Sequence, residues 1–123
     1  MANPNIVNVT TINGNMLSVA VGTSATSLVS NAASSGKVYK INSIVVANID
    51  GTAAADVTVN IYSAAALGGT ATAIASTISV PADATLIVTD KTTGFYLLEN
   101  QSIGAIAGTA GDLIATASWE EIT

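Results

Sequence analysis

The sequence has no cysteine, no histidine and no arginine, and its 123 residues include 3 lysines against 8 acidic side chains. The absence of cysteine and histidine excludes thiolate nucleophiles, Ser-His triads and Cys/His zinc sites. Three lysines and a net charge of −5 do not suit a surface that neutralises many phosphates, whether of nucleic acid or of anionic lipid. We therefore expect no nucleic-acid partner and no membrane partner.

Aromatic residues are also scarce, at 4% of the chain, and charged residues make up 9%. So few aromatic rings leave little material for a surface on which sugars could stack, which argues against a carbohydrate-binding module. No apolar run approaches the length of a membrane-spanning helix. The first residues lack the basic and apolar regions of a secretory signal peptide, so we expect none.

Hydrophobic residues, by contrast, make up 50% of the chain, and 13 isoleucines, 12 valines and 16 threonines dominate it. These β-branched types favour strands. The many Gly, Asn and Ser residues between apolar runs favour turns. The sequence predicts one all-β domain over residues 1–123, an antiparallel, jelly-roll-like β-sandwich of eight or nine short strands with no helix longer than a turn.

Alternating apolar and polar residues locate the expected strands. The stretch Val38–Asn48 is apolar on both faces near its end, which predicts a central strand. Asn13-Gly14 predicts a two-residue hairpin between the first two strands, and residues 1–12 are predicted to form an arm or edge strand that contacts a partner. The strands are expected over residues 6–12, 16–21, 25–30, 38–48, 57–62, 73–80, 85–89, 95–98, 102–107 and 113–120.

Two short patterns resemble the beginnings of chemical sites. Ser34 and Lys37 have the S-x-x-K spacing of penicillin-recognising enzymes, but the S-D-N partner motif is absent. We interpret this pattern as a turn before the strand at Val38. Asp50 and Asp56 flank a turn without the spacing of a calcium loop, so we interpret them as solvated carboxylates rather than a fortuitous or interface calcium site.

The few aromatic residues lie in predicted strands. Trp119 is interpreted as a core plug at one end of the sandwich rather than as an interface anchor. For Tyr39, Tyr62 and Tyr96 we expect a hydroxyl group at the edge of the core. The sequence therefore assigns no catalytic residue, no cofactor-binding residue and no metal ligand, and we expect a protein that is not an enzyme and carries no cofactor.

Several segments resemble a known family. They are Gly36–Asn48, Val80–Lys91, Phe95–Ile103, the ending Ala117–Ile122 and the opening Asn3–Thr10. Together they resemble small virion structural proteins of tailed phages, especially those of marine T4-like cyanophages. The similarity lies in patterned β segments without a chemical motif, so it transfers no functional residue.

The resemblance implies a virion structural protein made in the host cytoplasm. We expect a capsid decoration, or cement, protein on the outer head surface, which binds the major capsid protein and stabilises its lattice. We also expect a homo-oligomer, with a trimer favoured, because low charge limits repulsion between adjacent copies. The alternative is a neck, tail or fibre component of the virion, and a remote alternative is a carbohydrate-binding attachment module.

Overall fold

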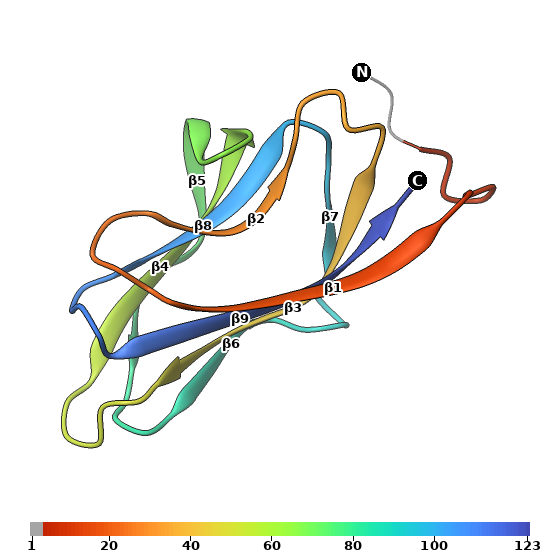
Figure 1. Cartoon of the computed structure of the whole chain (residues 1–123). Coiled ribbons are helices and arrows are strands. Elements are labelled where there is room, and N and C mark those ends of the chain that lie inside the picture. The colour runs from red at the N-terminus through yellow and green to blue at the C-terminus, as the bar shows by residue number, and fades with distance from the viewer. Residues whose placement is uncertain (1–3) are drawn as a thin grey trace.

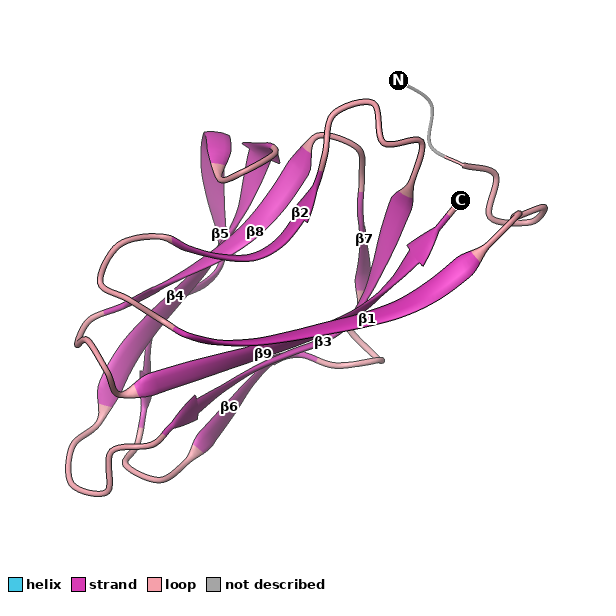
Figure 2. Cartoon of the chain, viewed as in Figure 1, coloured by secondary structure: helices cyan, strands magenta, loops and turns pink. Residues whose placement is uncertain are grey.

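The computed structural model describes residues 4–123 and contains nine strands and no helix in that range (Figures 1 and 2). No helix that could cross a membrane occurs in this part of the chain. The strands are β1 (Ile12–Ala20), β2 (Thr26–Asn31), β3 (Val38–Asn48), β4 (Ala55–Ala64), β5 (Gly68–Val80), β6 (Thr85–Thr89), β7 (Phe95–Leu97), β8 (Gln101–Ala107) and β9 (Leu113–Ile122).

The strands form two antiparallel sheets that pack face to face (Figure 1). The five-stranded sheet has the order β1-β9-β3-β6, and β7 also pairs with β3; the four-stranded sheet has the order β2-β8-β4-β5. Counted from the two chain ends, β1 pairs with β9, β2 with β8, β3 with β6 and β7, and β4 with β5. This is the order of a long hairpin rolled into a sandwich, which is the jelly-roll topology.

The interior is filled by alternate side chains of both sheets. In β9, Leu113, Ala115 and Ala117 are fully buried, while the residues between them are half-buried on the outer face. In β3, Ile44 and Val46 are fully buried in the same way. Because β3 lies between β9 and the β6–β7 pair, the prediction of a central strand at Val38–Asn48 is confirmed.

The predicted hairpin at Asn13-Gly14 is wrong. Gly14 lies inside β1, which pairs without interruption with β9, from Ile12 opposite Ile122 to Ala20 opposite Ile114. Gly14 also lacks the positive φ that a two-residue hairpin turn requires. Pairing with the last strand of the chain, which lies far away in sequence, overrides the local turn signal here.

The strand predicted over residues 6–12 is consequently wrong except at its last residue, since residues 6–11 contain turns and bends. Thr10 and Thr11 donate backbone hydrogen bonds to the carbonyl oxygen of Thr123. The side chain of Val7 is almost fully exposed. Residues 1–3 of the predicted arm lie outside the described part, and contact of the arm with a partner stays a prediction.

The turn between β4 and β5 is centred on Ala66 and Leu67, directly before Gly68 and Gly69. Gly68 donates its backbone hydrogen bond to the carbonyl of Ala65 at 3.1 Å. The two residues between them, Ala66 and Leu67, have φ values of 56° and 61°. Positive φ at both central positions is the geometry of a type I′ turn, so the chain reverses here at two residues other than glycine.

Candidate interaction surfaces

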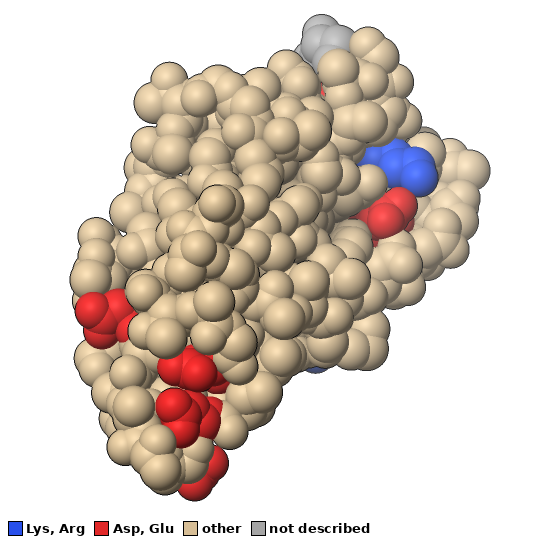
Figure 3. Space-filling view, turned by 60° about the vertical axis from the view of Figure 1, so that its left-hand side comes forward, with Lys and Arg blue, Asp and Glu red and all other residues tan. Residues whose placement is uncertain are grey.

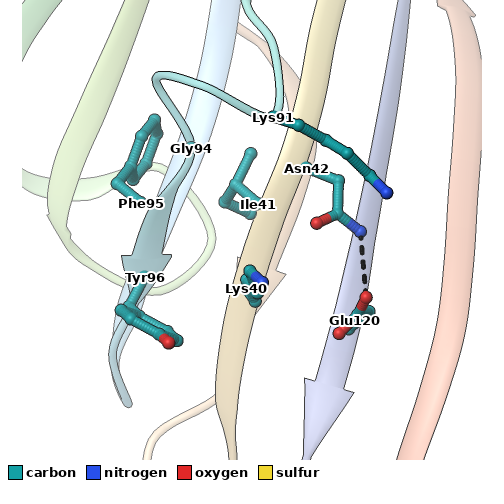
Figure 4. A pocket seen from close by; sticks show the side chains of 8 residues that line it. All are labelled: Lys40, Ile41, Asn42, Lys91, Gly94, Phe95, Tyr96 and Glu120. Carbon is teal, nitrogen blue, oxygen red and sulfur yellow. Dashed lines mark hydrogen bonds between the residues drawn. The ribbon is translucent and has the colours of Figure 1, made fainter.

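A cavity of about 180 Å³ opens on the outer face of the five-stranded sheet (Figure 4). It is lined by Lys40, Ile41, Asn42, Lys91, Gly94, Phe95, Tyr96 and Glu120. Asn42 donates a hydrogen bond from Nδ2 to Oε1 of Glu120 at 3.4 Å, and the side chain of Lys91 extends in the direction of this pair (Figure 4). Two of the 3 lysines of the chain therefore lie at one cavity, which offers ammonium and amide donors to a small polar group.

The loop between β6 and β7 forms one wall of this cavity. A Cβ at Gly94 would lie 2.6 Å from the carbonyl oxygen of Ile41, so only glycine allows the loop to approach β3 this closely. Asp90 holds the loop by accepting hydrogen bonds from Thr92, at 2.6 Å from Oγ1 and 2.9 Å from the backbone N–H. These bonds hold the pKa of Asp90 below its ordinary value.

The Ser34–Lys37 pattern forms a turn, as interpreted from the sequence. Ser34 and Gly36 have positive φ, and Ser35 Oγ accepts a hydrogen bond from the backbone N–H of Lys37 at 3.2 Å. Lys37 Nζ lies 3.1 Å from Glu121 Oε1. The hydrogen bond and charge of Glu121 raise the pKa of Lys37, so this ammonium group is engaged in an ion pair.

Four aspartates gather at one end of the sandwich. Asp50, Asp83 and Asp112 lie in three loops, and Asp56 lies at the start of β4. Backbone hydrogen bonds join these segments: Asp83 N–H donates to the carbonyl of Asp50, Ile49 N–H to that of Asp112, and Gly108 N–H to that of Asp56. Figure 3 shows acidic side chains clustered at one end of the face in view and, at the opposite end, a lysine with an acidic side chain beside it.

The loop that contains Asp50 is built from its own hydrogen bonds. Asp50 Oδ1 accepts from the backbone N–H of Thr52 at 2.9 Å and from its hydroxyl at 2.8 Å, which lowers the pKa of Asp50. The buried Asn48 side chain donates to the carbonyls of Ala53 and Val80, both at 2.9 Å. In the described residues, no three Asp or Glu side chains are placed to hold a metal ion. The geometry is that of a hydrogen-bonded turn.

The outer face of the five-stranded sheet is largely neutral. Ser18 Oγ and Thr116 Oγ1 share a hydrogen bond of 2.8 Å across β1 and β9, which places both side chains on this face. One row across four strands is Ser18, Thr116, Val45 and Ile87. The next row is Ala20, Ile114, Ala47 and Thr85.

Apolar side chains are exposed on this surface. Met16, two residues before Ser18 on β1, is 65% exposed, and Ile87 is 60% exposed. The charged residues Lys40 and Glu120 lie in a separate row toward the Ile12 end of β1. We call the two rows together with Met16 the neutral outer face; an exposed surface of this kind is typical of contact with another protein.

The aromatic residues follow the sequence interpretation with one exception. Trp119 is half-buried, packs against the core and stacks on Tyr39 with ring centroids 6.4 Å apart. Its Nε1 donates to Glu121 Oε2 at 3.3 Å. Tyr39 and Tyr62 are buried, and burial raises the pKa of Tyr39. Tyr96 differs, because 44% of it is exposed beside the cavity.

The neutral outer face was not identified from the sequence. Its signal was present, because Val45 lies in a run that is apolar on both faces. Such a run indicates a strand that is buried on both faces. On the outer face of β3, part of that burial comes from the side chains of neighbouring strands in the same sheet. The rows depend on β1 pairing with β9, a register that the predicted hairpin at Asn13-Gly14 obscured.

No protein-family model matches the chain, and no curated protein matches it in sequence. Two solved structures share its fold over most of their length. One is a chain from the disulfide-linked pili of Bacillus endospore appendages, with a TM-score of 0.55 and 16% identity over 92% of this chain and 87% of that chain. The other is a chain from the acid-stable capsid of Helicobacter pylori bacteriophage KHP30, with a TM-score of 0.56 and 8% identity over 94% and 90%. The jelly-roll-like sandwich predicted from the sequence is thus confirmed.

Proposed function

We propose that the protein is a virion structural protein of a tailed phage, of the T4-like cyanophage type, and that it decorates the outer surface of the head as a cement protein. The observation that carries the proposal is the neutral outer face, a broad apolar and hydroxyl-bearing surface on a domain with little other chemistry. The shared fold with a chain of a phage capsid structure supports it. In this role the protein is not an enzyme.

The mechanism is mass action. A protein that binds the assembled lattice of major capsid proteins, and not the free subunits, stabilises the lattice by its binding free energy. The neutral outer face is the contact surface, since its Ser, Thr and Ala side chains lose little rotamer freedom on burial. The acidic end, formed by Asp50, Asp56, Asp83 and Asp112, then lies at the margin of this contact and not within it. A trimer would match the three-fold positions of an icosahedral head. The molecular mass of the free protein in solution tests whether it contains three chains.

The experiment is co-sedimentation with phage heads that lack the protein, quantified as copies bound per head. Saturation at a number commensurate with three-fold positions is the expected result. The variant Ile87→Glu adds a charge to the neutral outer face and should weaken binding at least tenfold. Thr72→Glu is the control, because Thr72 is exposed on β5 of the other sheet, and it should bind as the wild type does.

Two results would overturn this assignment. If Thr72→Glu weakens binding and Ile87→Glu does not, the four-stranded sheet carries the contact surface. If the protein binds isolated tails or necks but not heads, it is a neck, tail or fibre component. The shared fold with a pilus chain supports that second candidate. A glycan array tests the remaining carbohydrate-binding prediction, which the exposed Tyr96 supports weakly because a single ring makes a small platform.

A further inference from the structure

The two sheets end in edges that differ in how they are protected against pairing with another chain. Exposed edges are commonly blunted by bulges, by interruptions or by short length. The β6–β7 edge is interrupted by the loop between these strands. β5 has irregular register with β4 at three places, and β2 is 6 residues long with a register shift between Ser27 and Val29.

β1 has none of these devices. Its 9 residues pair with β9 in unbroken register, and it contains neither proline nor a charged residue. All of its residues except Val19 are exposed, and no segment among residues 4–123 pairs with its outer edge. An edge strand directs alternate backbone N–H and C=O groups away from its sheet, so β1 offers a regular hydrogen-bonding template.

We propose that β1 pairs with β1 of a second copy of this chain, antiparallel and about a two-fold axis near Met16. A two-fold contact places identical residues opposite each other near the axis, where any charge would face a like charge. β1 has no charged side chain at any position, so this repulsion does not arise. The paired strands join two five-stranded sheets into one continuous sheet, with the two Met16 side chains adjacent.

The charge distribution of the molecule favours the antiparallel direction. The acidic end lies beyond the Ala20 end of β1, since Ala20 pairs with Ile114 and Asp112 directly precedes β9. Lys37 lies at the other end, directly before the residue that pairs with Ile122, the partner of Ile12. Antiparallel pairing keeps the two acidic ends apart and brings each near the end of the other copy where Lys37 is paired with Glu121.

The pairing has a geometric consequence for the surface described above. A two-fold axis perpendicular to the sheet places the neutral outer faces of both copies on the same side. Two such faces side by side form a larger surface for a third protein. The pairing does not depend on the proposed virion role, and it is compatible with three-fold association through other surfaces.

Cysteine crosslinking tests the contact directly, because the chain has no cysteine of its own. Met16→Cys, under mild oxidation, should give a disulfide-linked species of twice the 12.2 kDa chain mass on non-reducing gels. Ser18→Cys alone should not, because an axis at Met16 places Ser18 opposite Gly14 of the other copy and too far from the second Ser18 for a disulfide. Thr72→Cys, on the irregular β5 edge, is the matched control and should remain a single chain. Crosslinking of Met16→Cys at no more than the control rate overturns the proposal.

Charge swapping tests the two-fold symmetry. Met16→Lys and Met16→Glu should each weaken self-association at least tenfold in sedimentation equilibrium, since like charges then meet at the axis. An equimolar mixture should restore it, because Lys then faces Glu. Met16 is exposed, so both variants should keep the circular dichroism spectrum of the wild type. Association that persists in either variant, or that the mixture fails to restore, contradicts the two-fold contact and points to another occupant, such as residues 4–11 of a neighbouring copy.

Discussion

Two buried asparagines fix the loops at the two ends of the sandwich. Asn48 donates from Nδ2 to two carbonyls and accepts the backbone N–H of Asp50 at 2.9 Å. Asn31, which is fully buried, donates to the carbonyls of Lys37 and Leu97 at 2.9 and 3.3 Å. Among the described residues, no buried side-chain N or O atom lacks a hydrogen-bond partner. These amides therefore stabilise loop geometry without the cost of an unpaired polar group.

The variant Asn48→Ala should lower the free energy of unfolding by about 3 kcal/mol, because three hydrogen bonds are lost and two carbonyls are left without this donor. Urea denaturation followed by Trp119 fluorescence measures the change. Asn13→Ala, at an exposed position of β1, is the control and should change stability by no more than about 0.5 kcal/mol. Equal effects of the two substitutions would contradict the role assigned to Asn48.

Stability should be independent of pH between about pH 5 and pH 9, since no histidine or cysteine titrates there. Asp50 and Asp90 have lowered pKa values, so their contribution is present above the ordinary value of 3.8 and is lost as pH falls through the lowered pKa. Lys37 has a raised pKa, so its contribution is present below the ordinary value of 10.5 and is lost as pH rises through the raised pKa. Melting temperatures across this range test the prediction, and a step between pH 6 and pH 8 would contradict it.

At the scale of elements, the β4–β5 turn is held in a costly conformation by its surroundings. Ser30 Oγ accepts a hydrogen bond from Ala66 N–H at 3.0 Å, and Ser102 Oγ accepts one from Leu67 N–H at 2.9 Å. The Leu67 side chain lies over Gly104, where a Cβ would meet Leu67 Cδ2 at 2.7 Å. Packing and side-chain acceptors thus impose positive φ on two residues that disfavour it.

Ala66→Gly should therefore stabilise the protein, by about 0.5–1 kcal/mol, because glycine adopts positive φ without steric cost. The side chain of Ala66 is exposed, so its removal sacrifices little packing. Thermal unfolding by calorimetry measures the gain. Ala65→Gly, at the neighbouring position without positive φ, should instead lower stability slightly, and a gain of the same size there would show that the turn is unstrained.

The strands differ in how well the sequence predicted them. β3 and β6 match their predicted ranges at both ends, because alternation and flanking turn residues mark them locally. The hairpin at Asn13-Gly14 was wrong because the true partner of β1 is the last strand, and no local pattern encodes that register. The neutral outer face could not be predicted for the same reason, since it consists of rows that cross β1, β9, β3 and β6.

At the scale of the whole molecule, the jelly roll joins the first strand to the last. β9 lies between β1 and β3, so the five-stranded sheet is complete only when the end of the chain has been placed. Most strand pairs join segments far apart in sequence, which implies slow folding for a domain of this size. The two sheets also share one core, with buried residues from both in a single cluster.

One shared core predicts one cooperative unfolding transition. Trp119, on β9, reports on the five-stranded sheet, while far-UV circular dichroism reports on both sheets. Because neither sheet can keep its buried face without the other, the two probes should give the same urea midpoint and the same slope. Ala105→Gly, which removes a buried methyl group from β8 in the four-stranded sheet, should shift both midpoints downward together. A shift in the dichroism midpoint alone would mean that the four-stranded sheet unfolds separately, and the description of residues 4–123 as one cooperative domain would then be wrong.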